Sequence, residues 1–278
     1  MQASPDLSHE LEAACAVARE AAALVASFTG RPLDVQHKSG GEPVSRADLE
    51  SSELIVRRLA AAFPGDAILS EELPDTPSRL TNPRVWMVDP IDGTSDFLRG
   101  DAGYVVMIGL CLEGRPALGV VAQPATGCVW TGVVGTGAWK ELPNGDHAPL
   151  QVSAVKNARD IRLVASKSHR SDYYERFRRS LGITDELALG SVGLKVARVA
   201  AGLADAYLSV SSLTHEWDAC APDAILTAAG GVFTDCLGEP LLYNKPATET
   251  PHGLVATNGH LHGAVIKALE PIARERGW

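Results

Sequence analysis

The stretch Trp86–Phe97, WMVDPIDGTSDF, places two aspartates three residues apart after an apolar run. Residues 84–88 (RVWMV) have the composition of a short buried strand. Asp, Pro and Gly are common turn residues, so Asp89 and Asp92 have a simple interpretation as turn formers after a strand that ends at Val88. The other interpretation is that the two carboxylates hold a cation.

Further acids stand at similar places along the chain. Glu71 and Glu72 follow the apolar run 67–70, Asp48 lies at the start of a predicted helix, and Asp218 opens another. Singly, they are explained as a solvated pair and as helix N-caps. Together in one cleft, such carboxylates repel one another and must take up protons or bind cations. Oxygen ligands without His or Cys select Mg²⁺, Ca²⁺ or Mn²⁺ over zinc.

The residues around the two aspartates strengthen the cation hypothesis. The spacing Asp89-x-x-Asp92 can turn two carboxylates and the Ile91 carbonyl toward one point. Gly93 and Thr94 then supply backbone N–H groups at a turn, where such groups bind phosphate. A metal ion that bridges a phosphate accounts for both features. It also supplies positive charge to an otherwise acidic chain.

At this point the sequence resembles the lithium-sensitive, magnesium-dependent phosphomonoesterases, which include inositol monophosphatases, fructose-1,6-bisphosphatases and 3'(2'),5'-bisphosphate nucleotidases. Their pattern is an Asp, then Glu-Glu, Asp-Pro-Ile/Leu-Asp-Gly-Thr and Trp-Asp-x-x-Ala. It stands here, in order, at Asp48, Glu71–Glu72, Asp89–Thr94 and Trp217–Ala221. The match spans most of the chain.

The resemblance implies a role for each matching residue. Two Mg²⁺ ions would be bound by Glu71, Asp89, the Ile91 carbonyl, Asp92 and Asp218. Glu71 is preferred over Glu72 because the family uses the first acid of the pair. Asp48 and Thr94 would activate the attacking water together with Glu71, and a third, weaker metal ion would lie near Glu71 and Asp48. Substrate would be bound by Gly93, Thr94, Ser95, His169, Ser191, Lys195 and Asp218.

Two segments favour the bisphosphate nucleotidase branch. Ser166–His169 resembles a Ser-Arg/Lys-Ser-His stretch whose His lies by the nucleotide, and Gly190–Lys195 resembles a Gly-Ser-x-x-Leu-Lys segment whose Lys meets a second phosphate. The expected reaction is hydrolysis of the 3'-phosphate of 3'-phosphoadenosine 5'-phosphate by metal-activated water. Ser209 stands where that branch often has an Arg, so an inositol-1-monophosphatase or a broad sugar-phosphate phosphatase stays open. A non-catalytic metal-binding protein is a further alternative.

Composition restricts the partners. The chain has 278 residues and a formal charge of −9, which argues against binding a nucleic acid polymer. The 5 cysteines are odd in number and lack a CxxC pair, which is typical of a reducing cytosol. The sequence shows neither a signal pattern nor the roughly 18 apolar residues of a membrane span. We therefore expect a cytoplasmic protein, and the resemblance makes a homodimer an expected assembly.

The order of predicted elements indicates two sub-domains. Residues 1–150 group two helices before a run of antiparallel strands, an α+β pattern that carries most of the metal ligands, and the loop-like segment 142–150 ends it. Residues 151–278 alternate helices and strands, an α/β pattern that carries Asp218 and the specificity residues. The resemblance implies an α/β fold in which the layers form an αβαβα sandwich.

Overall fold

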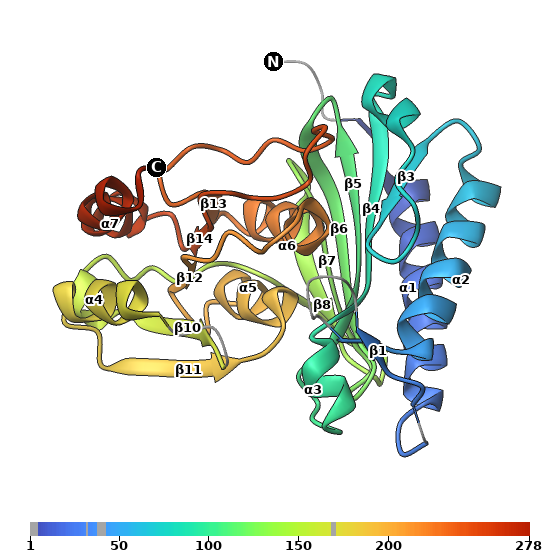
Figure 1. The fold of residues 1–278 in the computed structure, drawn as a ribbon, viewed down its shortest axis with the longest axis horizontal. Coiled ribbons are helices and arrows are strands. Elements are labelled where there is room, and N and C mark those ends of the chain that lie inside the picture. Colours follow the sequence, from blue (N-terminus) through green and yellow to red (C-terminus); the bar gives the residue numbers. More distant parts are fainter. Residues whose placement is uncertain (1–4, 32, 38–42, 168–170) are drawn as a thin grey trace.

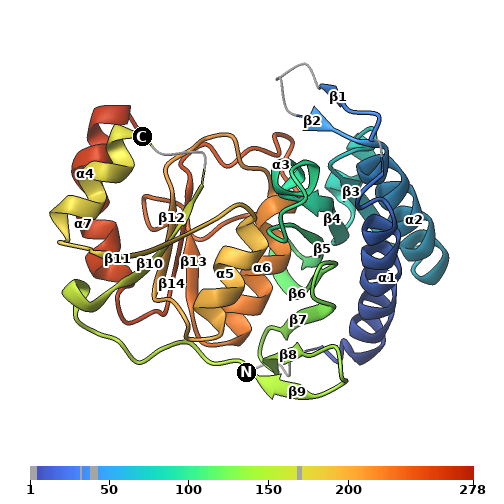
Figure 2. The same cartoon turned by 90° about the horizontal axis from the view of Figure 1, so that it is seen from below.

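Two β-sheets and three helical layers alternate across the molecule (Figure 1). The computed structural model describes residues 5–31, 33–37, 43–167 and 171–278. Helices α1 (Ser8–Ser27) and α2 (Arg46–Ala62) cover the outer face of the larger sheet, and α4 (Asp172–Ser180) and α7 (His262–Arg276) cover the outer face of the smaller one. Helices α5 (Val192–Ala200) and α6 (Glu216–Ala228) lie between the sheets, as Figure 2 shows from another side. The expected αβαβα sandwich is confirmed.

The strands of the larger sheet lie side by side in chain order, whereas those of the smaller sheet do not. In the described ranges, the larger sheet contains β3 (Ala67–Ser70), β4 (Arg84–Asp92), β5 (Val105–Leu112), β6 (Arg115–Gln123), β7 (Cys128–Val133), β8 (Gly137–Glu141) and β9 (His147–Pro149) in sequential order. The smaller sheet has the order β11 (Asp185–Leu189), β10 (Arg162–Ser166), β12 (Ala206–Ser209), β14 (Leu254–Thr257) and β13 (Val232–Thr234). A short pair, β1 (Gln36–His37) with β2 (Pro43–Val44), and the short helix α3 (Thr94–Leu98) lie outside these layers.

The structure differs from the sequence-based expectations at several points. β3 pairs parallel to β4, so the larger sheet is not purely antiparallel. The segment 142–150, which we expected to be a loop, contains the exposed edge strand β9. Strands β11 and β14 lacked a recognisable pattern in the sequence, because neither alternates polar and apolar residues in the way that indicates a half-buried strand. The division at residue 150 stays a prediction, although the two sheets fall on either side of it.

Strand β4 extends through both aspartates of the opening motif and does not end at Val88. Its pairing with β5 shifts register after Asp89: Asp89 lies opposite Met107, but Asp92 lies opposite Val105. Three steps on β4 therefore match two on β5, which defines a β-bulge. Residues three apart in a regular strand point to opposite faces of the sheet. The bulge removes this alternation, so both carboxylates can face the same side.

Pro90 is compatible with its position inside this strand. A proline has no backbone N–H and is tolerated in strands mainly at edges and bulges. Here the Pro90 carbonyl accepts a hydrogen bond from Ser51 Oγ on α2, at 3.5 Å. The remaining part of β4, from Val85 to Val88, is fully buried because helices cover both faces of the sheet.

Helix α6 packs against a stripe of glycines that runs across the larger sheet. Gly109, Gly119 and Gly132 are direct cross-strand neighbours on β5, β6 and β7. A Cβ atom at Gly119 would lie 2.1 Å from the carbonyl oxygen of Ala221, a backbone atom of α6. The absence of side chains thus lets the helix backbone approach the sheet directly. Since α6 begins at Glu216, this contact fixes the position of Asp218 relative to β4.

We predict that Gly119→Ala lowers the free energy of unfolding by at least about 1–3 kcal/mol, because the added methyl group meets backbone and cannot be accommodated by a side-chain rotation. Denaturant unfolding followed by circular dichroism measures the effect. Gly65→Ala is the matched control, because a Cβ there meets nothing within 4 Å. Equal midpoints for the two variants would contradict the proposed close contact.

A buried carboxyl lies further along the same helix. Asp223 is 5% exposed, and its carboxylate oxygens accept hydrogen bonds from Tyr243 Oη at 2.8 Å and Thr227 Oγ1 at 3.0 Å. Burial nevertheless raises the pKa of Asp223 to about 7. Between the ordinary pKa of an Asp and this value, the folded state binds a proton that the unfolded state does not. The protein therefore loses stability as pH rises through this window.

We predict that Asp223→Asn reduces this pH dependence, because the amide does not titrate. Between pH 4.5 and pH 7, the variant should gain stability relative to the unmodified protein by up to about 1.4 kcal/mol per pH unit. Unfolding midpoints measured in urea across this range provide the test. Parallel pH profiles for the two proteins would show that the Asp223 carboxyl titrates as it does in water.

Candidate active site

One pocket lies between the two halves of the chain and collects most of the residues singled out from the sequence. It has a volume of about 240 Å³. The predicted site residues that line it are Glu71, Asp89, Ile91, Asp92, Gly93, Thr94, Ser95, Lys195 and Asp218. Glu72 is not among the residues that line it.

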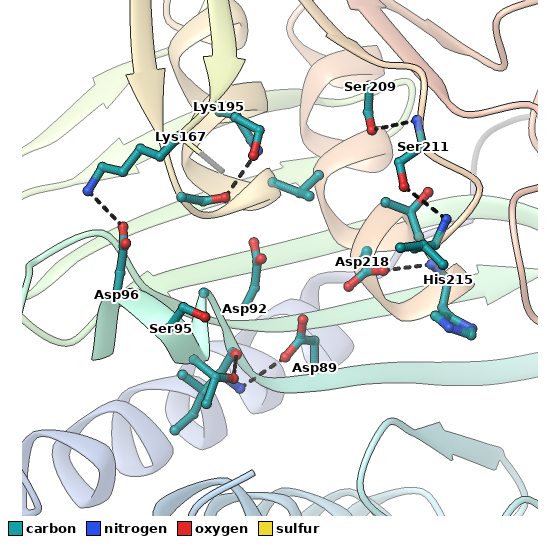
Figure 3. Close-up of a pocket in the computed structure, with 18 of the residues that line it drawn as sticks. Asp89, Asp92, Ser95, Asp96, Lys167, Lys195, Ser209, Ser211, His215 and Asp218 are labelled. Carbon is teal, nitrogen blue, oxygen red and sulfur yellow. Dashed lines mark hydrogen bonds and ion pairs between the residues drawn. The ribbon is translucent and has the colours of Figure 1, made fainter. Parts of the chain in front are cut away.

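Four carboxylates reach this pocket from three different elements. Asp89 and Asp92 come from the bulge of β4, Glu71 directly follows β3, and Asp218 lies in the first turn of α6. Glu71 is held next to β4 because its backbone N–H donates to the Val88 carbonyl at 3.1 Å. Figure 3 shows Asp89, Asp92 and Asp218 grouped around a common space.

The carboxylates are close enough to perturb one another. Asp89 is 1% exposed, and burial is the main reason that its pKa lies well above the usual range. The charges of Glu71, Asp92 and Asp218 raise the pKa of Asp89 further. Burial also raises the pKa of Asp92, although hydrogen bonds from Ser191 and Gly193 oppose this. The group therefore carries more negative charge than its protein surroundings neutralise.

Lys195 is the buried cation on this side of the pocket. It is 2% exposed, although most lysines of folded proteins are exposed to solvent. Its Nζ donates to the Gly190 carbonyl at 3.0 Å and lies 4.8 Å from the centre of the Tyr207 ring. Burial lowers the pKa of Lys195 to about 8, against the opposing influence of Asp92 and Asp218.

Each of the three aspartates has one carboxylate oxygen held by the chain. Asp89 Oδ1 accepts from the Ile91 N–H at 3.0 Å. Asp92 Oδ2 accepts from Ser191 Oγ at 2.6 Å and from the Gly193 N–H at 2.7 Å. Ser191, in the second half of the chain, therefore orients Asp92, in the first half, although Ser191 does not itself line the pocket.

Asp218 is fixed by the start of its helix. Asp218 Oδ2 accepts from the backbone N–H of the N-cap residue His215 at 2.6 Å. Asp218 is thus the third residue of α6 and not its N-cap.

Asp48 and Thr94 form a hydrogen-bonded pair behind the carboxylates. Thr94 Oγ1 donates to Asp48 Oδ1 at 3.2 Å and to the Ile91 carbonyl at 3.1 Å. The other oxygen of Asp48 accepts from the Ser45 N–H at 2.7 Å and from Ser45 Oγ at 2.6 Å, which completes a capping box at the start of α2. Asp48 is buried, and burial raises its pKa.

Gly93 joins this pair to the helix α3. Its φ of 100° belongs to the left-handed region, and a Cβ atom would lie 2.9 Å from the Gly103 carbonyl oxygen. Only glycine satisfies both conditions. The turn presents Gly93, Thr94 and Ser95 at the pocket wall, with Ser95 exposed.

Several pocket residues were not identified from the sequence. Lys167 and Arg99 line the pocket and both contact Asp96, while His215 stacks on Trp217 with ring centroids 4.5 Å apart. Asp96 and Lys167 lie inside segments that we quoted from the sequence, but their pairing joins positions 71 residues apart and has no local signal. The predicted substrate contact His169 lies outside the described residues.

The donor set fits hard divalent cations. It consists of carboxylates with one nearby carbonyl, the ligands that Mg²⁺ prefers, and contains no thiolate. Within the described ranges, no three Asp, Glu, His or Cys side chains are yet arranged around one point as a metal requires.

All five cysteines are buried with free thiols. None of the helices in the described part of the chain is both long and apolar enough to cross a bilayer.

Comparison with known proteins places these residues in a family. The model of the inositol monophosphatase family matches residues 6–274. The chain is 34% identical to the 3'(2'),5'-bisphosphate nucleotidase CysQ of Escherichia coli K12, over 84% of this chain and 93% of that protein. It is 31% identical to a histidinol-phosphatase of Chlorobaculum parvum, over 98% of this chain and 100% of the relative.

A solved structure shows the same architecture. The extragenic suppressor protein suhB of Bartonella henselae superposes with a TM-score of 0.83 at 25% identity, covering 95% of this chain and 99% of that one. The family match over nearly the whole chain, the identity to curated phosphatases and the arrangement of carboxylates agree. The chain belongs to the inositol monophosphatase family and is a phosphoric monoester hydrolase.

Proposed function

We propose that this protein is a Mg²⁺-dependent 3'(2'),5'-bisphosphate nucleotidase that removes the 3'-phosphate of 3'-phosphoadenosine 5'-phosphate. The observation that carries the chemistry is the convergence of Glu71, Asp89, Asp92 and Asp218 on one pocket beside the Thr94–Asp48 hydrogen bond. The substrate is supported by the identity to the Escherichia coli nucleotidase and by the buried Lys195 at the same pocket.

The four carboxylates and the Ile91 carbonyl would hold two Mg²⁺ ions, and a third ion would lie near Glu71 and Asp48. Mg²⁺ bound there supplies Lewis acidity, which polarises the phosphoryl oxygens and acidifies water. The chain supplies the fixed geometry, because Ser191 and Gly193 hold Asp92 in place from outside the pocket and the backbone N–H of His215 holds Asp218.

Thr94 and Asp48 are placed to handle the proton of the attacking water. Thr94 Oγ1 has one proton and two acceptors within reach, Asp48 Oδ1 and the Ile91 carbonyl. When it donates to Asp48, its lone pairs would accept a proton from the attacking water. Ser45 holds the far oxygen of Asp48 with two hydrogen bonds and prevents the carboxylate from rotating. Water would then displace the alcohol directly, without a phosphoenzyme.

The turn at Gly93–Ser95 would bind the phosphate that is cleaved. The N–H groups of Thr94 and Ser95, the first two residues of α3, have no acceptor within their helix, and both residues line the pocket next to Gly93, which adds no side chain. Lys195 would meet a second phosphate. His169 is proposed to lie by the nucleotide. We further propose a cytoplasmic location and a homodimeric assembly.

We predict that Asp89→Asn lowers phosphate release at saturating Mg²⁺ by at least about a hundredfold, because it removes a central metal ligand. The fold should persist, since Asn has the same shape and relieves repulsion with Glu71 and Asp92. Thermal unfolding gives a second measurement: Mg²⁺ should raise the melting temperature of the unmodified protein and not that of the variant.

The matched control is Asp146→Asn, which changes an exposed carboxylate in the 142–147 turn. It should keep both the activity and the Mg²⁺-dependent stabilisation. Near-normal turnover by Asp89→Asn at saturating Mg²⁺ would refute the assignment of the metal site.

The substrate proposal predicts a ranking. Phosphate release should show the highest kcat/KM for 3'-phosphoadenosine 5'-phosphate among four substrates, the others being inositol 1-phosphate, fructose 1,6-bisphosphate and histidinol phosphate. Activity should disappear in EDTA and return with Mg²⁺. A preference for inositol 1-phosphate or histidinol phosphate would reassign the substrate within the family, and metal-dependent stabilisation without any turnover would indicate a binding protein.

A further inference from the structure

A cluster of three cations forms one corner of the pocket, which we call the basic corner: Arg99, Lys167 and Lys195. Lys167 Nζ donates to Asp96 Oδ2 at 3.0 Å, and Arg99 donates to Asp96 Oδ1. Lys195 lies close enough for Asp96 to raise its pKa, and its Nζ is bonded to the adjacent Gly190 carbonyl. The three cations come from the loop after α3, the end of β10 and the helix α5. The corner therefore forms only when the two halves of the chain meet.

Asp96 is the fixed centre of this corner. Its side chain is 3% exposed. It fills a slot between two glycines, because a Cβ atom would lie 2.0 Å from Asp96 Oδ2 at Gly103 and 2.3 Å from it at Gly190. A carboxylate held so tightly cannot follow a cation that moves. Any rearrangement of the corner must be made by the side chains of Arg99 and Lys167.

These two side chains are accessible from the pocket. The Arg99 side chain is 55% exposed and the Lys167 side chain 38% exposed, and both line the pocket. Both side chains also form an ion pair with Asp101, which is itself 47% exposed. Ion pairs between two exposed side chains contribute little to stability. An anionic group in the pocket can therefore form ion pairs with both Arg99 and Lys167.

The charge of the pocket is divided between two sides. Figure 3 shows Asp96 and Lys167 on one side, whereas Asp218 and His215 lie on the other, with Asp89 and Asp92 between them. The carboxylates Asp89, Asp92 and Asp218 must bind metal cations before they can attract an anion. The basic corner has three cations around one buried carboxylate, so it attracts an anion directly.

We propose that the basic corner is a second anion subsite, in which Arg99 and Lys167 bind the phosphate of a substrate that is not cleaved. This inference rests on the proposed function and extends it: the corner determines the preference for substrates with two phosphates over those with one. The buried Lys195 adds a fixed positive charge to the subsite. The partly exposed Arg99 and Lys167 donate hydrogen bonds to the phosphate. Asp96 positions them and does not contact the substrate.

The test compares two nucleotides that differ only by the 5'-phosphate, 3'-phosphoadenosine 5'-phosphate and adenosine 3'-monophosphate. For Lys167→Met and Arg99→Met, the ratio of kcat/KM for the bisphosphate to that for the monophosphate should fall about tenfold each, as expected for loss of a charge-assisted hydrogen bond. Lys167→Arg should restore most of the ratio. Lys156→Met, which removes an exposed cation remote from the pocket, should leave the ratio unchanged.

An equal decrease in kcat/KM for both nucleotides would overturn the proposal. It would show that the contacts of Arg99 and Lys167 with Asp96 only stabilise the packing of the two halves of the chain. An unchanged ratio would overturn it as well. If the unmodified enzyme hydrolyses neither nucleotide, the proposed function fails independently. The same variants are then assayed on inositol 1,4-bisphosphate against inositol 1-phosphate, and a ratio that falls with Lys167→Met supports the subsite.

Discussion

Repulsion between buried carboxylates is the constraint on which the rest of this site depends. Asp89, Asp92, Glu71 and Asp218 perturb one another in a pocket where Lys195 is the buried cation. Such a group raises its pKa values and destabilises the folded chain, unless cations are bound. The surrounding structure must therefore hold the carboxylates against their own repulsion. A bulge in β4, a glycine stripe under α6 and hydrogen bonds from Ser191 and His215 each serve this purpose.

The same local device fixes an acid at two separate places. Asp48 and Asp218 are both the third residue of a helix, and each accepts a hydrogen bond from the backbone N–H of its N-cap residue, at 2.7 Å and 2.6 Å. The sequence offered capping and function as alternative interpretations of these aspartates. The structure shows that one carboxylate can have both roles, because its two oxygens face different ways. For Asp48, one oxygen completes the capping box and the other accepts from Thr94.

Local patterns in the sequence predicted the two N-terminal helices, and acids at element ends indicated a carboxylate cluster. The layered fold and the individual site residues were expected from the resemblance to a family. The sequence did not predict the bulge, since Asp89-Pro90 and Asp92-Gly93 are equally compatible with a turn. Nor could it predict that Lys167 meets Asp96 or that Gly119 meets Ala221, because these contacts join residues from distant parts of the chain. Long-range pairing leaves no periodic signal.

The pocket explains how a protein with a negative net charge can bind an anionic substrate. A chain with a net charge of −9 repels phosphate esters on average, so binding has to depend on charge at particular points. The carboxylates create one such point only after they bind cations, and the cations around Asp96 create another without any. The two points differ in their dependence on metal, because the cations of the second point are side chains of the protein itself, such as Lys167, which contacts Asp96. Without divalent ions, the protein can therefore keep its affinity for the phosphate that is not cleaved and lose its capacity for hydrolysis.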